Sequence, residues 1–137
     1  MDTSFVIRPV GVVRSELVSR EGAPRQGREG APDAWLELDA AIAPCLDGLA
    51  VGDELVLLTW LHQADRTTMK VHPRGETKNP LTGVFATRSP DRPNPIGLHR
   101  VRVLARDGGR LRVGPLEAVD GTPVVDLKPV LDDVLDA

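Results

Sequence analysis

The residues with the clearest chemical potential lie in one proline-rich segment, residues 87–97 (TRSPDRPNPIG). Three prolines and a glycine in so short a span exclude a helix or an internal strand. Because each proline also restricts the unfolded backbone, the loop should be rigid. A rigid loop that carries arginine, serine, threonine and asparagine suits a polar ligand, since little order is lost on binding. This segment therefore predicts a binding loop, in which Arg88 could hold a carboxylate.

Two other positions carry weaker signals. The tetrapeptide at residues 120–123 (DGTP) is typical of a turn. His62 directly follows a continuous apolar run, and a polar residue that opens a loop often points into a cleft. A structural histidine with satisfied hydrogen bonds remains the alternative for His62.

Most familiar chemical signatures do not occur in the sequence. It contains no GxGxxG, no Walker A loop, no HExxH and no GxSxG. His62, His72 and His99 lack helical metal-ligand spacing, and one cysteine cannot form an internal disulfide or a multi-cysteine zinc site. We therefore expect no metal, and we expect Cys45 to be a small buried apolar side chain.

Charge is distributed unevenly along the chain. The formal net charge is −3, yet residues 62–100 contain seven basic and three acidic side chains, a local charge of +4. A basic stretch on an acidic protein can bind phosphate if its side chains share one face. A solvated loop whose charges offset one another is an equally weighted alternative.

Composition predicts short strands that position these residues. The chain has 137 residues, 13 Gly, 12 Pro and 3% aromatics, which does not favour long helices. We predict a single domain, residues 1–137, that is mainly β: a small β-barrel with long rim loops and one or two short helices. The expected strands are residues 5–13, 34–38, 54–61, 83–86, 98–105, 111–113 and 124–126. We also expect a short helix at residues 40–46 that is capped by Asp39, and a terminal helical turn at residues 131–135. Long loops are expected at residues 14–33 and 62–82.

Nothing in the sequence predicts a membrane protein or a secreted one. The longest apolar run, around residues 55–61, is too short to span a bilayer. The first ten residues (MDTSFVIRPV) carry an acid at position 2 and do not resemble a signal peptide. Cytoplasmic residence fits this pattern and the single cysteine.

Residues 85–90 (FATRSP) and 92–97 (RPNPIG) resemble the signature of the TsaA-like family. That family includes bacterial tRNA methyltransferases that use S-adenosylmethionine to methylate the N6 nitrogen of threonylcarbamoyladenosine beside the anticodon. Other elements resemble the family in the same order, namely residues 7–15 (IRPVGVVRS), 24–26 (PRQ), 60–63 (WLHQ) and 120–129 (DGTPVVDLKP). The resemblance covers nearly the whole chain, and the central stretch is its most specific part.

The resemblance implies a β-barrel that binds S-adenosylmethionine without a Rossmann domain, in a homodimer with the cofactor site near the interface. Longer members carry an additional C-terminal domain, and many have tyrosine where Val130 stands. The cofactor-binding residues implied by matching positions are Pro24, Arg25, Gln26, His62, Gln63, Phe85, Ala86, Thr87, Arg88, Leu98, Asp120, Gly121, Thr122 and Pro123.

The implied reaction transfers the sulfonium methyl group to nitrogen, with tRNA as the expected substrate. Positioning can supply much of the rate of such an in-line displacement. Asp120 suits the cofactor's amine or ribose hydroxyls, and Arg88 suits a carboxylate of the cofactor or of the threonyl group. The proton lost by the nitrogen could pass to His62, Asp126 or solvent, so the catalytic candidates are His62, Arg88 and Asp126.

The basic stretch supplies the candidate RNA contacts, which are Lys70, Arg74, Lys78 and Arg92. Two other functions stay open. One is a non-catalytic module that binds S-adenosylmethionine and signals its level, and the other is a methyltransferase that acts on a small molecule. The basic stretch favours RNA.

Overall fold

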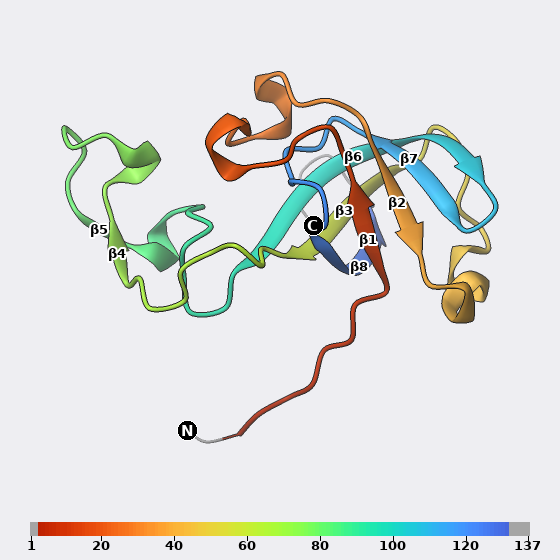
Figure 1. The fold of residues 1–137 in the computed structure, drawn as a ribbon, viewed down its shortest axis with the longest axis horizontal. Coiled ribbons are helices and arrows are strands. Elements are labelled where there is room, and N and C mark those ends of the chain that lie inside the picture. The colour runs from red at the N-terminus through yellow and green to blue at the C-terminus, as the bar shows by residue number, and fades with distance from the viewer. Residues whose placement is uncertain (1–2, 132–137) are drawn as a thin grey trace.

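The protein, seen in a computed structural model that describes residues 3–131, is built mainly of β-strands (Figure 1). Six antiparallel strands pair in the order β1-β2-β7-β6-β3-β8, and β8 pairs back to β1, so the sheet closes into a barrel. The mainly β prediction is confirmed. The strands of this sheet are β1 (Gly11–Arg14), β2 (Ala34–Leu38), β3 (Glu54–Trp60), β6 (Ile96–Asp107), β7 (Arg110–Gly114) and β8 (Pro123–Pro129).

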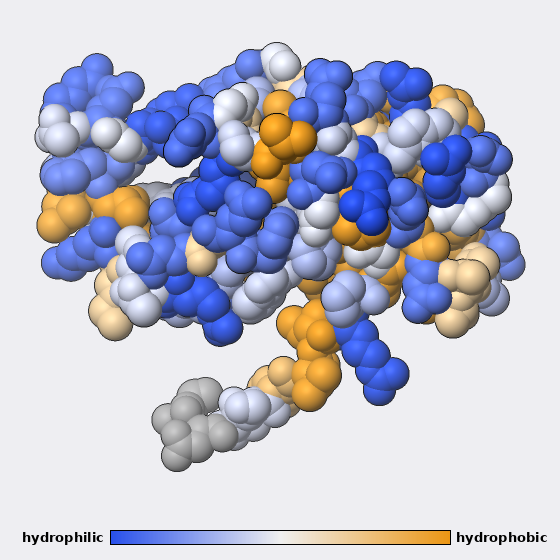
Figure 2. All heavy atoms as spheres, in the orientation of Figure 1, coloured by the Kyte–Doolittle hydropathy of each residue, from blue (hydrophilic) through white to orange (hydrophobic). Residues whose placement is uncertain are grey.

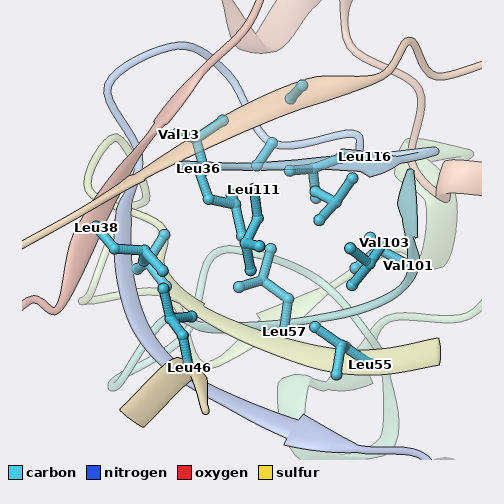
Figure 3. Packing of buried hydrophobic residues seen from close by; sticks show 14 residues of the cluster. Val13, Leu36, Leu38, Leu46, Leu55, Leu57, Val101, Val103, Leu111 and Leu116 are labelled. Atoms are coloured by element: carbon cyan, nitrogen blue, oxygen red, sulfur yellow. The ribbon is translucent and has the colours of Figure 1, made fainter. Parts of the chain in front are cut away.

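The interior of the closed sheet is filled by aliphatic side chains from nearly every strand (Figure 3). Leu55 and Leu57 of β3 point inward beside Leu36 of β2 and Leu111 of β7, and all four are at most 1% exposed. The inward positions alternate along each strand, as the pleat requires. The core therefore fixes the strands that carry the candidate site.

Turn chemistry explains how the strands are connected. β6 and β7 form the predicted hairpin, and Gly108 occupies its turn with φ of 59°, a conformation that glycine adopts without strain. The short helix after β2 is η3 (Ala40–Leu46), a 3-10 helix whose first turn is capped by Asp39 through a hydrogen bond from Ala41 N of 3.0 Å. The hairpin and the capped helix are confirmed.

An arm, residues 67–87, extends away from the barrel (Figure 1). Its small sheet pairs Lys70 with Gly83 and Val71 with Thr82. Most of the arm lies within the long loop predicted for residues 62–82, where the structure adds β4 (Lys70–Val71) and η4 (Pro73–Gly75). The arm ends in β5 (Thr82–Gly83) and η5 (Val84–Ala86).

Several local predictions are wrong. The first strand begins at Gly11 instead of residue 5, because the preceding residues leave the barrel, and Phe5 and Val6 are 86% and 90% exposed (Figure 2). Residues 84–86, predicted as strand, form the 3-10 turn η5. Cys45 is exposed because it lies on the outer side of η3. The helical turn predicted for residues 131–135 falls almost wholly outside the described residues.

The loop between β1 and β2 contains two further 3-10 turns, η1 (Arg20–Gly22) and η2 (Gly27–Glu29). Among residues 3–131, no helix is long and apolar enough to cross a membrane.

Candidate functional site

A groove of about 700 Å³ lies where five chain segments meet. These segments are the turn η2 with the residue before it, the arm with the start of the loop that follows it, the start of β3, the first half of β6, and the end of β7 with its continuation. The lining residues are Gln26, Gly27, Arg28, Glu54, Arg74, Arg88, Leu98, His99, Arg100, Val101, Arg102, Gly114, Pro115 and Glu117.

The floor of the groove contains a buried hydrogen-bonded array. His99 of β6 is 5% exposed; its Nδ1 lies 2.5 Å from Glu117 Oε1, and its Nε2 lies 2.7 Å from Thr59 Oγ1 of β3. Because a carboxylate only accepts, His99 Nδ1 donates to Glu117, while the Thr59 hydroxyl can donate or accept. Among the described residues, every buried side-chain nitrogen and oxygen has a hydrogen-bond partner. The array therefore holds the Glu117 carboxylate in a defined position.

Two glycines make this array possible. A Cβ at Gly97 would lie 2.6 Å from His99 Nε2 and closer still to Thr59 Oγ1, so no larger residue fits without displacing the hydrogen bond. A Cβ at Gly27 would lie 3.0 Å from Pro115 O and 3.1 Å from Glu117 Oε2. The backbone of η2 thus approaches the second oxygen of Glu117 closely.

Arginines and carboxylates form the walls of the groove. Glu54 receives hydrogen bonds from Arg100 Nε at 2.8 Å and from Arg102 Nη2 at 2.6 Å. Arg74 of the arm donates to Glu29 of η2 at 2.7 Å, and this hydrogen bond lowers the pKa of the Glu29 carboxyl below its usual 4.5. The Arg74–Glu29 contact joins the arm to η2 across one side of the groove.

The proline-rich loop is braced by its own side chains. Arg92 donates to Val84 O at 2.5 Å and to Thr87 O at 3.1 Å, which fixes the backbone beside Arg88. Thr87 Oγ1 donates to Val84 O at 2.9 Å and accepts from Ser89 N at 3.1 Å. These contacts support the prediction that the loop is rigid.

The same loop is fastened to the segment that follows β3. Arg66 lies 5.0 Å over the Trp60 ring and donates to Pro93 O and Asn94 Oδ1 at 2.8 and 3.0 Å. Asp65 accepts two hydrogen bonds from Thr67, and these lower the pKa of its carboxyl. The two segments therefore form one braced unit at this end of the barrel.

The groove brings together three predicted cofactor-binding residues that are far apart in sequence, namely Gln26, Arg88 and Leu98. Arg25 precedes Gln26, and its guanidinium lies beside Gly75 of the arm, where a Cβ would be 3.3 Å from Arg25 Nη2. Phe85 and Ala86 are exposed on η5, directly before the braced loop.

Other predicted residues lie outside the groove lining. The exposed pair His62 and Gln63 lies near η1, where Gln63 O accepts from Arg20 at 3.0 Å. Asp120 Oδ1 accepts from Ser15 N at 3.1 Å. Residues 120–123 do not belong to the lining of this groove. Of that turn, Thr122 is buried and donates to Val119 O at 2.7 Å.

Asp126, a predicted catalytic residue, lies on β8 opposite Leu58, and Leu58 in turn lies opposite Leu98 on β6. It forms an ion pair of 3.2 Å with Lys128. Asp126 and the groove residue Leu98 thus flank the same position of β3.

The predicted RNA contacts have different surroundings. Lys70 is exposed on β4, and Lys78 forms an exposed ion pair of 3.0 Å with Glu76. Arg74 lines the groove and binds Glu29, and Arg92 braces the loop backbone. Of the four predicted RNA contacts, Lys70 and Lys78 of the arm are therefore the two that neither line the groove nor brace the loop.

Sequence reasoning missed His99, Glu117 and Thr59. A signal existed for two of them: Thr59 interrupts an apolar strand, and His99 occupies an inward position in register with Val101 and Val103. A polar side chain at an inward strand position requires a buried partner. Among residues 3–131, no group of three or more His, Cys, Asp or Glu side chains could hold a metal ion.

The described part of the chain is thus a small β-domain with a closed antiparallel sheet, an arginine-lined groove and a basic arm. Comparison with known proteins assigns the family: residues 12–136 match the family described as the tRNA-methyltransferase O N-terminal domain, and the chain belongs to it. The TsaA-like resemblance found in the sequence is thereby confirmed.

Similar proteins include both short relatives and longer ones. A probable S-adenosyl-L-methionine-binding protein of Methanothermobacter thermautotrophicus is 44% identical over 133 residues, which cover 97% of this chain and 95% of that protein. An S-adenosyl-L-methionine-binding protein of Archaeoglobus fulgidus is 44% identical over 127 residues, covering 90% and 88%. The crystal structure of TrmO from Pseudomonas aeruginosa matches with a TM-score of 0.77 and 33% identity, over 98% of this chain but only 61% of that one.

Proposed function

We propose that this protein is an S-adenosylmethionine-dependent methyltransferase that modifies tRNA at the N6 nitrogen of threonylcarbamoyladenosine, and that the groove beside Arg88 holds the cofactor. One observation carries the proposal: three residues that the family resemblance implies for cofactor binding, Gln26, Arg88 and Leu98, line a single groove. Family membership and the names of the short relatives support the cofactor.

The groove fits the cofactor in size and in chemistry. Its volume of about 700 Å³ lies in the range of roughly 300–1,000 Å³ usual for small-molecule sites. Leu98 offers an apolar surface, Gln26 an amide, and Arg88 a guanidinium suited to a carboxylate. When bound, S-adenosylmethionine supplies the methyl group, and the residues of the groove orient the cofactor.

The braced loop and the groove floor perform that orientation. Arg92 and Thr87 fix the backbone that carries Arg88, so little order is lost when a ligand binds. Two side chains are candidate proton acceptors. Asp126 on β8 lies opposite Leu58 of β3, which also lies opposite the groove residue Leu98 on β6, whereas His62 lies near η1. We therefore propose Asp126, rather than His62, as the acceptor to test first.

The proposed RNA surface is the arm, with Lys70 and Lys78. Their exposure suits contact with phosphates, and the arm that carries them extends away from the barrel (Figure 1). A homodimer is part of the proposal. The exposed side chains of Phe85 (86%) and Ile96 (42%), beside the braced loop, are apolar surface that a second copy could cover.

Two experiments test this function. Calorimetry with S-adenosylhomocysteine should show binding to the wild-type protein, and the absence of binding would contradict the cofactor assignment. Incubation with methyl-labelled S-adenosylmethionine and tRNA that carries unmethylated threonylcarbamoyladenosine should transfer label to tRNA.

The names of the short relatives favour a second candidate, a module that binds S-adenosylmethionine without catalysis. In that case, label would stay with bound cofactor and none would enter tRNA. Label that appears in a small metabolite instead would favour the small-molecule methyltransferase.

A further inference from the structure

Glu117 occupies a special position among the acidic groups of the groove. Its side chain is 15% exposed and lines the groove; Oε1 is bound by His99, while Oε2 lies beside the backbone of Gly27. His99 is in turn held by Thr59, which is fully buried. The carboxylate is thus presented to the groove from a rigid support in the barrel.

Charge in the groove explains why this carboxylate matters. The described lining contains the guanidinium groups of Arg28, Arg74, Arg88, Arg100 and Arg102 and the carboxylates of Glu54 and Glu117. Glu54 already faces Arg100 and Arg102 at 2.6–2.8 Å, whereas Glu117 contacts a histidine. Of the two acids in the described lining, Glu54 is therefore paired with arginines and Glu117 with a histidine.

S-adenosylmethionine has two cationic groups, the sulfonium and the α-ammonium, and one carboxylate. Arginine suits the carboxylate but repels both cations, and this repulsion grows in a partly water-excluded groove. A ligand of this kind needs an acid where its ammonium group sits.

We propose that Glu117 binds the α-ammonium group of the cofactor's methionyl part, while the arginines bind its carboxylate. This inference rests on the proposed function and names the residue that selects an amino-acid ligand at that site. A hydrogen bond between an ammonium and a carboxylate is charge-assisted and about twice as strong as a neutral one. Because Glu117 is held by His99, little side-chain freedom is lost when the bond forms.

The test compares two ligands on one variant by calorimetry. Glu117→Gln keeps the shape of the side chain and an acceptor oxygen for His99, but removes the charge. We expect its affinity for S-adenosylhomocysteine to fall at least tenfold, while its affinity for 5′-methylthioadenosine, which has no amino-acid part, changes less than twofold. Glu37→Gln on β2, an exposed acid paired with Arg14, is the matched control and should change neither affinity.

A ligand-side measurement makes the test independent of how the variant folds. Wild-type protein should bind S-adenosylhomocysteine at least tenfold more tightly than the analogue in which hydrogen replaces the α-amino group. Equal affinities, or an equal loss for both ligands in Glu117→Gln, would overturn the inference. If the wild-type protein binds as expected but transfers no methyl group to tRNA, only the proposed enzymatic function fails.

Discussion

The groove floor and the arm both contribute residues to the same groove, but the floor is held by buried contacts and the contact between the arm and η2 is exposed. The floor consists of strand residues whose polar atoms are buried and bonded to each other, as with Thr59 and His99. The outer part of the arm is joined to η2 by an exposed side-chain contact, Arg74 on Glu29. Buried polar contacts are costly to break, whereas exposed ion pairs contribute little. The floor should therefore be fixed by the fold, and the arm should be free to adjust to a partner.

The largest expected effect on stability comes from adding a side chain at Gly97, next to the hydrogen bond between His99 and Thr59. Gly97→Ala would push a methyl group against His99 Nε2 and Thr59 Oγ1, both buried. We expect a loss of about 1–3 kcal/mol in the free energy of unfolding, measured by urea denaturation.

Gly83→Ala in the arm is the matched control. A Cβ there meets no heavy atom within 4 Å, and the φ of Gly83 is −58°. Its unfolding free energy should change by less than about 0.5 kcal/mol. Similar losses in the two variants would remove the distinction between floor and arm.

Arg88→Ala separates ligand binding from stability. Arg88 is exposed on the braced loop and lines the groove, so its truncation leaves no cavity. A hydrogen bond to a charged group contributes about 1.5–3 kcal/mol, so methyl transfer should slow roughly tenfold to hundredfold while the melting temperature barely changes. Arg110→Ala, which removes an exposed arginine stacked at 4.5 Å on Trp35, should leave the rate unchanged. A collapse of the melting temperature in Arg88→Ala would make Arg88 a structural residue.

Reversing charge on the arm tests its contact with RNA. The double variant Lys70→Glu with Lys78→Glu should bind tRNA more weakly and with a shallower salt dependence, by about 0.7–0.9 in slope for each phosphate contact removed. Its affinity for S-adenosylhomocysteine should be unchanged, because neither lysine lines the groove among the described residues. The control is the double variant Arg110→Glu with Arg112→Glu on β7, which makes the same change in charge away from the arm and should leave the salt slope unchanged. Equal salt slopes for the wild type and the arm variant would place RNA away from the arm.

The smallest effect concerns the contact between the arm and η2. Arg74 lowers the pKa of Glu29 below 4.5, so the ion pair is fully formed above that pH and is lost as pH falls through the lowered pKa. NMR titration should show that the pKa of Glu29 rises toward its usual value in Arg74→Gln, while Lys78→Gln leaves it unchanged. An unaltered pKa in Arg74→Gln would mean that the arm does not rest on η2 in solution.

Local rules predicted the parts of the fold that neighbouring residues decide. Asp39 caps η3 because its carboxylate accepts from the backbone two residues later, and Gly108 permits the turn between β6 and β7. The same rules failed for residues 5–9, which were predicted to begin the first strand but belong to no strand of the sheet. A strand needs a partner, and the partner is chosen by the whole fold.

The sequence by itself determined that the chain is mainly β, that the proline-rich residues 87–95 form a polar loop, and that its motifs belong to one family. These properties follow from residue types at short spacing. Residues 96–97, predicted as part of that loop, instead begin β6 and pair with β3. Only the tertiary structure decided which motifs meet: it joined Gln26, Arg88 and Leu98 in one groove and left Asp120 bonded to Ser15 outside it. It also placed His99 and Glu117 beneath the groove. Strand register sets such juxtapositions, because it brings residues 40 positions apart, such as Thr59 and His99, within 2.7 Å of each other.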